Sequence, residues 1–394
     1  MKKNRIFITC PKGLQRYLAA EARSLGFPVL SESVSGVETE GALDDTMRLN
    51  LLLRTGHRVL YLLSEFRAKT PDQLYRETAK VPWEDYIHEN GYISVTSTVD
   101  TPAVNDSRFA NLKCKDAIAD RFTKRFGRRP DSGPERDRAV AHLHWKDEEC
   151  ALYIDTSGEP LTKRGYRKIP LQAPLQETLA AAIVLATGWQ DNGHFINPMC
   201  GSGTLAIEAA LIGLNKAPGI LRSNFCFMHL KGFNKALWEE LRRDALLLCS
   251  KSLRHRVIAS DVSRQAVDAA RENARNAGVD HLIEYGVSEF ADTPVPQEGG
   301  GIVLLNPEYG ERMGQMDELA DTYKGIGDFF KQKCKGYTGY VFTGNPVLAK
   351  KVGLRSRRKV QFFNSNIECR LLEYELYEGT KKPNRSGPEL IPGP

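Results

Sequence analysis

Alternating and helical patterns of hydrophobic residues follow one another at the start of the chain. Three segments alternate between apolar and polar side chains, as half-buried strands do: residues 5–10, 29–40 and 57–64. Residues 11–26 and 44–53 instead place apolar side chains at the spacing of an amphipathic helix. The order of strand, helix, two strands, helix and strand predicts a ferredoxin-like domain over residues 1–66.

A second α+β unit follows over residues 67–156. Helical patterns cover residues 71–80 and 107–126, and residues 92–99 alternate as a strand. Two further strand patterns, residues 139–145 and 150–155, flank a polar turn and predict a hairpin. The long helix carries many cations, with two phenylalanines near its end.

The pattern changes to a regular alternation of apolar strands and helices over residues 172–380, after a linker at 157–171. Such alternation predicts an α/β fold, with a parallel sheet covered by helices on both faces. The strand patterns at 359–363 and 367–377 predict an antiparallel hairpin at one edge of this sheet. The tail over residues 381–394 is rich in proline and glycine, and we expect it to be disordered.

The first candidate binding motif is a glycine-rich loop between a strand and a helix. Residues 195–204 read Phe-Ile-Asn-Pro-Met-Cys-Gly-Ser-Gly-Thr, and a helix pattern follows at once. Glycines at this position allow a tight turn and a close approach of the backbone to a ligand. Ala206 occupies the third position of a dinucleotide-binding pattern, so this loop alone leaves a dinucleotide open. A Walker A loop is excluded, because no Gly-Lys-Ser/Thr follows.

Two carboxylates follow the next two strands. Asp261 ends the strand at 256–260, where a carboxylate is placed to accept both ribose hydroxyls of a nucleoside-like cofactor. Glu289 follows the next strand and is placed to meet the adenine end. The alternative for Asp261 is a structural role, capping the helix that begins near Ser263.

The third motif is Asn306-Pro307-Glu308-Tyr309, delivered to the same sheet edge by an apolar strand. The Asn306 side-chain oxygen and the Pro307 carbonyl are placed to accept hydrogen bonds from an exocyclic amine. Tyr309 is placed to stack on a target base that has left its own stack. The motif therefore favours methylation of an amine.

With these motifs in order, the chain resembles the THUMP-domain class I RNA methyltransferases, and among them the bacterial 23S rRNA guanine-N2 methyltransferase module. The resemblance also rests on residues 112–120, 155–158, 163–167, 173–183 and 363–372. It implies a Rossmann-like methyltransferase domain, preceded by a ferredoxin-like domain and a THUMP RNA-binding domain. It also implies S-adenosylmethionine as the cofactor.

The resemblance implies roles for single residues. The implied cofactor contacts are Asn197, Pro198, Met199, Gly201, Gly203, Thr204, Asp261 and Glu289, and the implied target-base contacts are Asn306, Pro307 and Tyr309. Two positions depart from the family pattern. Asn197 stands where the family often has aspartate, and Glu308 stands where a second proline is usual.

Charge and composition favour contacts with RNA and give no indication of a metal site. The net charge of +6 weakly favours an acidic partner. We expect RNA contacts from one set of cations: Lys113, Lys115, Arg121, Lys124, Arg125, Arg164, Arg167 and Arg312. The eight cysteines lack zinc spacing, and a solvated or core-edge position is favoured over a metal site for His142 and His144.

The predicted function is methyl transfer to guanine N2 of 23S rRNA in the cytoplasm, since no signal peptide or membrane span is found in the sequence. Three alternatives remain open. The first is the same reaction on tRNA, and the second is glutamine methylation of a protein. The third is an RNA-binding assembly factor with a weak site, motivated by Glu308. The sequence gives no indication of the oligomeric state.

Overall fold

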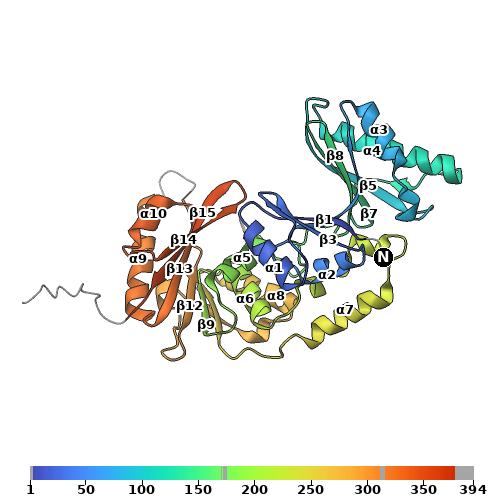
Figure 1. Cartoon of the computed structure of the whole chain (residues 1–394). Helices are drawn as coiled ribbons and strands as arrows, with labels where there is room; N and C mark the ends of the chain where they lie inside the picture. The colour runs from blue at the N-terminus through green and yellow to red at the C-terminus, as the bar shows by residue number, and fades with distance from the viewer. Residues whose placement is uncertain (1–2, 170, 172–174, 311–315, 378–394) are drawn as a thin grey trace, which may run out of the picture.

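The computed structural model describes residues 3–169, 171, 175–310 and 316–377 of the chain. The described residues form one sheet of eight strands and one of seven. Helices α3 (Pro71–Lys80) and α4 (Ser107–Phe126), with the strands beside them, project as a lobe from the rest of the molecule (Figure 1). Within the described ranges, every helix is too short or too polar to cross a membrane.

The N-terminal unit has the predicted ferredoxin-like order. Its elements are β1 (Asn4–Thr9), α1 (Gln15–Ser24), β2 (Ser31–Ser33), β3 (Gly36–Gly41), α2 (Asp45–Leu52) and β4 (Arg58–Arg67). Strand β1 lies between β3 and β4, and Ile6 and Ile8 on its inner face are fully buried. Leu18 and Ala22 of α1 are also fully buried, so the alternating and helical patterns identified the core.

The second unit contains the predicted helices and hairpin. Besides α3 and α4 it has β5 (Tyr92–Asp100), β6 (Asp131–Ser132), β7 (Ala139–Lys146) and β8 (Glu149–Asp155). The hairpin between β7 and β8 turns at Asp147, whose φ is +51°. His142, on β7, bonds Thr96 Oγ1 through Nδ1 at 2.9 Å. The described residues hold no group of three or more His, Cys, Asp or Glu side chains that could bind a metal.

One strand belongs to both N-terminal units. The sheet order is β2-β3-β1-β4-β8-β7-β5-β6, so the two units share a continuous sheet. The first half of β4 pairs with β1, and nearly its whole length, from Leu60 to Arg67, pairs with β8. The predicted boundary at residue 66 therefore falls within β4. A hinge there would break backbone hydrogen bonds of the sheet.

The C-terminal sheet has the predicted parallel strands and antiparallel edge hairpin. Its order is β11-β10-β9-β12-β13-β15-β14. The strands are β9 (His194–Pro198), β10 (Val257–Asp261), β11 (Ile283–Val287), β12 (Gly301–Leu305), β13 (Tyr337–Thr343), β14 (Arg358–Asn364) and β15 (Ile367–Glu375). The helices that accompany them are α5 (Glu177–Thr187), α6 (Thr204–Gly213), α8 (Arg264–Ala277), α9 (Met316–Lys333) and α10 (Pro346–Lys351).

The strand order determines where a ligand can bind. Strand β9 lies between β10 and β12, and the chain passes from β9 outward to β10 and later back to β12. Open α/β sheets bind their ligands in the crevice outside the carboxyl ends of the strands at such a reversal, which here lies between β9 and β12. The three predicted motifs all follow strands at this edge. The α/β fold class predicted from the sequence is confirmed.

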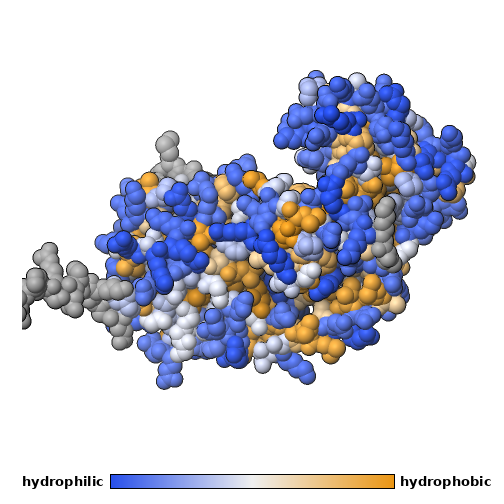
Figure 2. Space-filling view, in the orientation of Figure 1, coloured by the Kyte–Doolittle hydropathy of each residue, from blue (hydrophilic) through white to orange (hydrophobic). Residues whose placement is uncertain are grey.

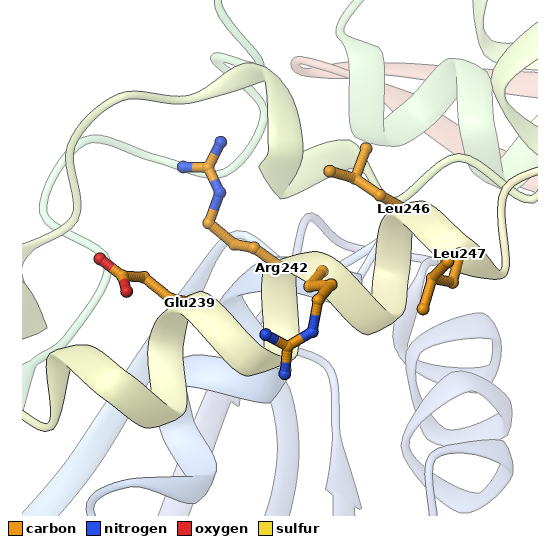
Figure 3. A pocket seen from close by; sticks show the side chains of 5 residues that line it. Glu239, Arg242, Leu246 and Leu247 are labelled. Atoms are coloured by element: carbon orange, nitrogen blue, oxygen red, sulfur yellow. The ribbon is translucent and has the colours of Figure 1, made fainter.

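Helix α7 (Lys235–Leu247) was not predicted. It contacts α2, and in Figure 1 it lies below α2 at the lower right, away from the C-terminal sheet at the left. Figure 3 shows a shallow pocket lined by Glu239, Arg242, Arg243, Leu246 and Leu247, all from this one helix. The pocket is therefore separate from the crevice.

A buried ion pair joins the two halves of the chain. Arg164 Nε donates to Glu208 Oε1 at 3.1 Å, and both side chains are almost completely buried. Arg164 Nη2 also donates to the carbonyl of Arg54 in the ferredoxin-like unit. Tyr166 Oη donates to Glu208 Oε1 at 3.0 Å. These bonds connect α6, which follows the glycine loop, to the N-terminal sheet.

Candidate active site

The glycine loop after β9 is shaped by two glycines with different roles. Gly201 has φ +54°, and a Cβ added there would meet no atom within 4 Å, so the space beside it is open. Gly203 has φ +82°, and an added Cβ would lie 2.8 Å from the Cβ of Ala270 on α8. Gly201 thus leaves room for a ligand, whereas Gly203 permits close packing of α6 against α8.

Asp261 at the end of β10 is tied to this loop. Its Oδ2 accepts a hydrogen bond from the backbone N–H of Gly201 at 3.0 Å. Its Oδ1 accepts one from the N–H of Ser263 at 3.0 Å. Ser263 itself caps α8, since its hydroxyl accepts from the N–H of Ala266. A carboxylate has about four acceptor positions, so Asp261 retains capacity for ligand hydroxyls.

Asn197 provides an unsatisfied acceptor beneath the loop. Its Nδ2 donates to the carbonyl of Leu304 on β12 at 2.8 Å, which fixes the side chain between two strands. Its Oδ1 is buried and has no hydrogen-bond partner within the described part of the chain. An unpaired buried acceptor costs roughly 1–3 kcal/mol, so this oxygen favours a ligand that brings an N–H or O–H donor.

Glu289 lies beside Asp261 at the same edge. The N–H of Ser288 donates to the carbonyl of Asp261 at 3.1 Å, which places the segment after β11 next to the end of β10. Glu289 is exposed. The carboxylates predicted from two separate strands are thus brought to one rim of the crevice.

The target-base motif follows β12. Pro307 is buried, Asn306 and Tyr309 are half-buried, and Glu308 is exposed. Tyr309 Oη donates to Asn306 Oδ1 at 2.7 Å. Burial raises the pKa of Tyr309, and a hydrogen bond with Asn364 opposes that rise. The amide oxygen predicted to accept from an amine therefore already accepts one hydrogen bond from the tyrosine, and it retains a second acceptor position for a base.

Residues from α9 and the segment after β13 hold this motif, and none of them was predicted from the sequence. Tyr323 Oη donates to the carbonyl of Glu308 at 3.1 Å and lies 2.6 Å from Thr343 Oγ1. Asn345 Nδ2 donates to the carbonyl of Tyr309 at 2.9 Å. The carbonyls of residues 308 and 309 are therefore both held by side chains from other elements. Tyr323 is fully buried in α9, and the sequence gives no signal of its contact with residue 308.

Two predicted RNA contacts are wrong. The guanidinium of Arg164 is buried against Glu208, so it cannot reach a phosphate. Arg167 also points inward, where it pairs with Glu177 at 3.2 Å and donates to Thr204 Oγ1 at 3.1 Å. Both arginines instead support the helix that follows the glycine loop. Arg312 lies outside the described residues.

The cations of α4 divide into paired and unpaired groups. Arg121 donates to both carboxylate oxygens of Glu84 at 2.7 Å, and Arg125 also pairs with Glu84. Lys113 pairs with Asp72 at 3.2 Å. Lys115 is half-buried and Lys124 is exposed. Hydrophilic residues cover most of the visible surface of this lobe (Figure 2). The RNA contacts predicted for α4 remain predictions, and Arg121 has a structural partner.

The Arg121–Glu84 pair predicts a pH dependence of stability. Its hydrogen bonds lower the pKa of Glu84 to about 2 from an ordinary value of 4.5. The pair therefore stabilises the fold fully above pH 4.5, and this contribution is lost as the pH falls towards 2. Between pH 2.5 and 7, we expect the free energy of unfolding of Glu84→Gln to change by on the order of 3 kcal/mol less than that of wild type. The measurement is urea unfolding at a series of pH values. Glu89→Gln, at an exposed carboxylate, is the control. If the unfolding free energy had the same slope against pH in both variants, the pH dependence would not come from the Arg121–Glu84 pair.

The sheet order and the three motifs at its carboxyl edge define a class I methyltransferase. Residues 164–373 match the family model "RMKL-like, methyltransferase domain". Residues 5–60 match the "RlmL ferredoxin-like domain", and residues 68–155 match the "THUMP domain". The chain belongs to the RMKL-like methyltransferase family, and the resemblance seen in its sequence is confirmed.

Relatives and solved structures agree with this assignment. The ribosomal RNA large subunit methyltransferase K/L of Syntrophotalea carbinolica is 40% identical over 383 residues, which are 95% of this chain and 54% of that protein. A Synechocystis sp. protein provisionally named an RNA methyltransferase is 35% identical over 94% of this chain and 96% of its own length. The crystal structure of SMU.472, provisionally named a methyltransferase and solved with S-adenosylhomocysteine, has a TM-score of 0.87 at 26% identity, covering 96% of this chain and 100% of that one. The chain spans about half the length of the K/L proteins that it matches.

S-adenosylmethionine is the methyl donor of this class, and the residues present fit it. The open space beside Gly201 admits a ligand, and Asp261 retains acceptor capacity for ribose hydroxyls. The unpaired Oδ1 of Asn197 suits a donor such as the cofactor's amino group. The substitution of asparagine for the usual aspartate at this position thus preserves an acceptor.

Proposed function

We propose that this chain methylates the exocyclic N2 amine of guanine in 23S rRNA. The observation that carries the proposal is the Asn306–Tyr309 motif, which follows β12 at the same sheet edge as the glycine loop and Asp261. The THUMP match supports RNA as the substrate, and the name of the Syntrophotalea relative supports ribosomal RNA of the large subunit.

The proposed chemistry is mainly positioning. S-adenosylmethionine supplies an electrophilic methyl group attached to a sulfonium. The Asn306 amide oxygen and the Pro307 carbonyl accept hydrogen bonds from the two N–H groups of the amine, which directs the nitrogen lone pair. Tyr309 stacks on the extruded base. The amine loses a proton to water during or after the transfer. Fixing the two reactants in this geometry supplies most of the rate.

Glu308 distinguishes this motif from the usual family sequence. Its side chain is exposed, and its carbonyl is held by Tyr323. The carboxylate therefore does not fill the space beside Asn306, and it is available to accept from guanine N1–H. This position supports an active enzyme over an assembly factor with a weak site.

The function is tested by transfer of a tritiated methyl group from S-adenosylmethionine to an unmodified 23S rRNA transcript, followed by nucleoside analysis. Labelled N2-methylguanosine would support the proposal. Label on tRNA and not on 23S rRNA would move the function to tRNA. Label that survives ribonuclease treatment and follows protein would indicate glutamine methylation. Absence of label with intact cofactor binding would indicate an RNA-binding assembly factor.

The cofactor role of Asp261 gives a separate prediction. Replacing Asp261 by asparagine removes a charged acceptor, and we expect the Kd for S-adenosylhomocysteine to rise about 10- to 100-fold in isothermal titration calorimetry. Asp268→Asn, at an exposed carboxylate of α8, is the matched control. An unchanged Kd would show that Asp261 serves only to hold Gly201 and Ser263.

A further inference from the structure

The loop between β1 and α1 contacts the C-terminal hairpin beside the target-base motif. Lys12 Nζ lies 4.1 Å from the centroid of the Phe363 ring, near the end of β14. Gly13 has φ +90°, and a Cβ added there would lie 3.3 Å from Phe363 Cδ2. The ferredoxin-like unit therefore contacts the end of β14, where Asn364 hydrogen-bonds Tyr309 of the target-base motif. Figure 1 shows α1 next to the hairpin of β14 and β15.

A chain of aromatic rings connects this loop to the motif. Tyr17 of α1 stacks on Phe362 with ring centroids 5.6 Å apart and an interplanar angle of 11°. Phe362 packs edge-on against Phe342 at 6.1 Å, and Phe342 packs edge-on against Tyr309 at 6.3 Å. Tyr309 in turn bonds Asn306. The contacts lead from the N-terminal unit to the predicted amine acceptor without a gap.

Two cations stand on the outer side of these rings. Lys12 and Arg16 are both exposed. The guanidinium of Arg16 lies 4.8 Å from the Tyr17 ring centroid, and its Nη2 donates to Tyr17 Oη at 2.8 Å. Neither cation forms an ion pair with any carboxylate in the described ranges. This differs from α4, where Lys113, Arg121 and Arg125 are neutralised by acidic neighbours.

We propose that Lys12 and Arg16 bind backbone phosphates of the RNA next to the extruded target nucleotide. The aromatic rings beneath them hold the two side chains in place, which reduces the entropy lost on binding. Unpaired cations at the rim of the site attract phosphates without reading sequence. This inference rests on the proposed function, because the target nucleotide must be part of an RNA strand. The ferredoxin-like unit thereby completes the substrate site of the methyltransferase domain.

The test measures RNA binding separately from methyl transfer. The Kd for a 23S rRNA transcript is determined by filter binding over a series of salt concentrations, for wild type, Lys12→Ala, Lys12→Arg and the double variant Lys12→Ala/Arg16→Ala. We expect the double variant to bind about 10- to 100-fold more weakly, with the slope of log K against log salt reduced by about two. Lys12→Arg keeps the charge and should restore binding to within about threefold of wild type.

Lys3→Ala is the matched control, because Lys3 is an exposed cation at the opposite end of β1. The KM for RNA should rise in the double variant, while kcat at saturating RNA and the Kd for S-adenosylhomocysteine stay within about twofold. A salt slope equal to that of wild type, or a loss equal to that of Lys3→Ala, would overturn the inference. A wild type that binds RNA but methylates none would refute the proposed function and leave the binding comparison valid. A wild type that binds no RNA would overturn both.

Discussion

Replacing Asn306 by alanine is expected to lower the rate of methyl transfer by roughly 10²- to 10³-fold at saturating cofactor and RNA. The side-chain oxygen is the one amide acceptor of the motif, and alanine leaves the amine held only by the Pro307 carbonyl. Cofactor affinity should stay unchanged, because Asn306 follows β12 and bonds Tyr309, not the glycine loop. The measurement is single-turnover transfer of labelled methyl, together with calorimetry of S-adenosylhomocysteine.

Two variants separate this effect from a general loss of structure. Asn192→Ala changes an exposed asparagine just before β9, at the opposite edge of the same sheet, and should retain full activity. Tyr309→Phe keeps the ring but removes the hydroxyl that donates to Asn306 Oδ1. It should therefore lose less than about tenfold of the rate, since stacking is preserved. A full rate in Asn306→Ala would show that the amine is held elsewhere.

Replacing Arg164 by alanine is expected to destabilise the protein by about 3–5 kcal/mol. The change leaves the carboxylate of Glu208 buried without its cation, and it also removes the bond to the Arg54 carbonyl. We expect a lower midpoint of urea unfolding for the whole chain, with unfolding monitored by tryptophan fluorescence. Trp83 and Trp189 are both buried, one in each half of the chain, and both contribute to that signal.

The double variant Arg164→Met/Glu208→Met provides the diagnostic comparison. It removes both charges and keeps the volume, so we expect it to recover most of the lost stability. Lys163→Ala, at an exposed cation whose ion pair with Glu159 lies on the surface, should change stability by about 1 kcal/mol or less. If the double variant were as unstable as Arg164→Ala, the loss would come from packing and not from the unpaired charge.

The parts of the site that lie on continuous segments could be predicted from the sequence. In each motif an apolar strand is followed directly by the polar residues that it delivers. Asp261, Gly201 and Asn306 are therefore brought to one sheet edge by the order of strands alone. The clamp formed by Tyr323 and Asn345 could not be found in this way, because its contacts with the carbonyls of residues 308 and 309 cross between separate elements.

The burial of single charged residues could not be predicted from the local sequence. Arg164 and Arg167 lie in a polar segment, so they looked like surface cations. The signal that could have corrected this is Glu208, a carboxylate in the middle of the apolar helix α6. A buried carboxylate needs a buried partner, and a cation from outside the helix was the natural candidate. Lys12 was not predicted as an RNA contact, because its position over Phe363 depends on a contact between domains that are distant in the sequence.

The continuous strand β4 gives the molecule a fixed length scale. Ten residues of strand span about 33 Å, and a rotation of the lobe against the ferredoxin-like unit would break hydrogen bonds of the shared sheet. The ion pair between Arg164 and Glu208 fixes the other end of this arm to the methyltransferase sheet. If the lobe holds the RNA, as proposed, this arrangement would present to the crevice only a nucleotide at a set distance along the RNA fold. Selection by distance would make the modified position depend on RNA shape more than on the neighbouring bases.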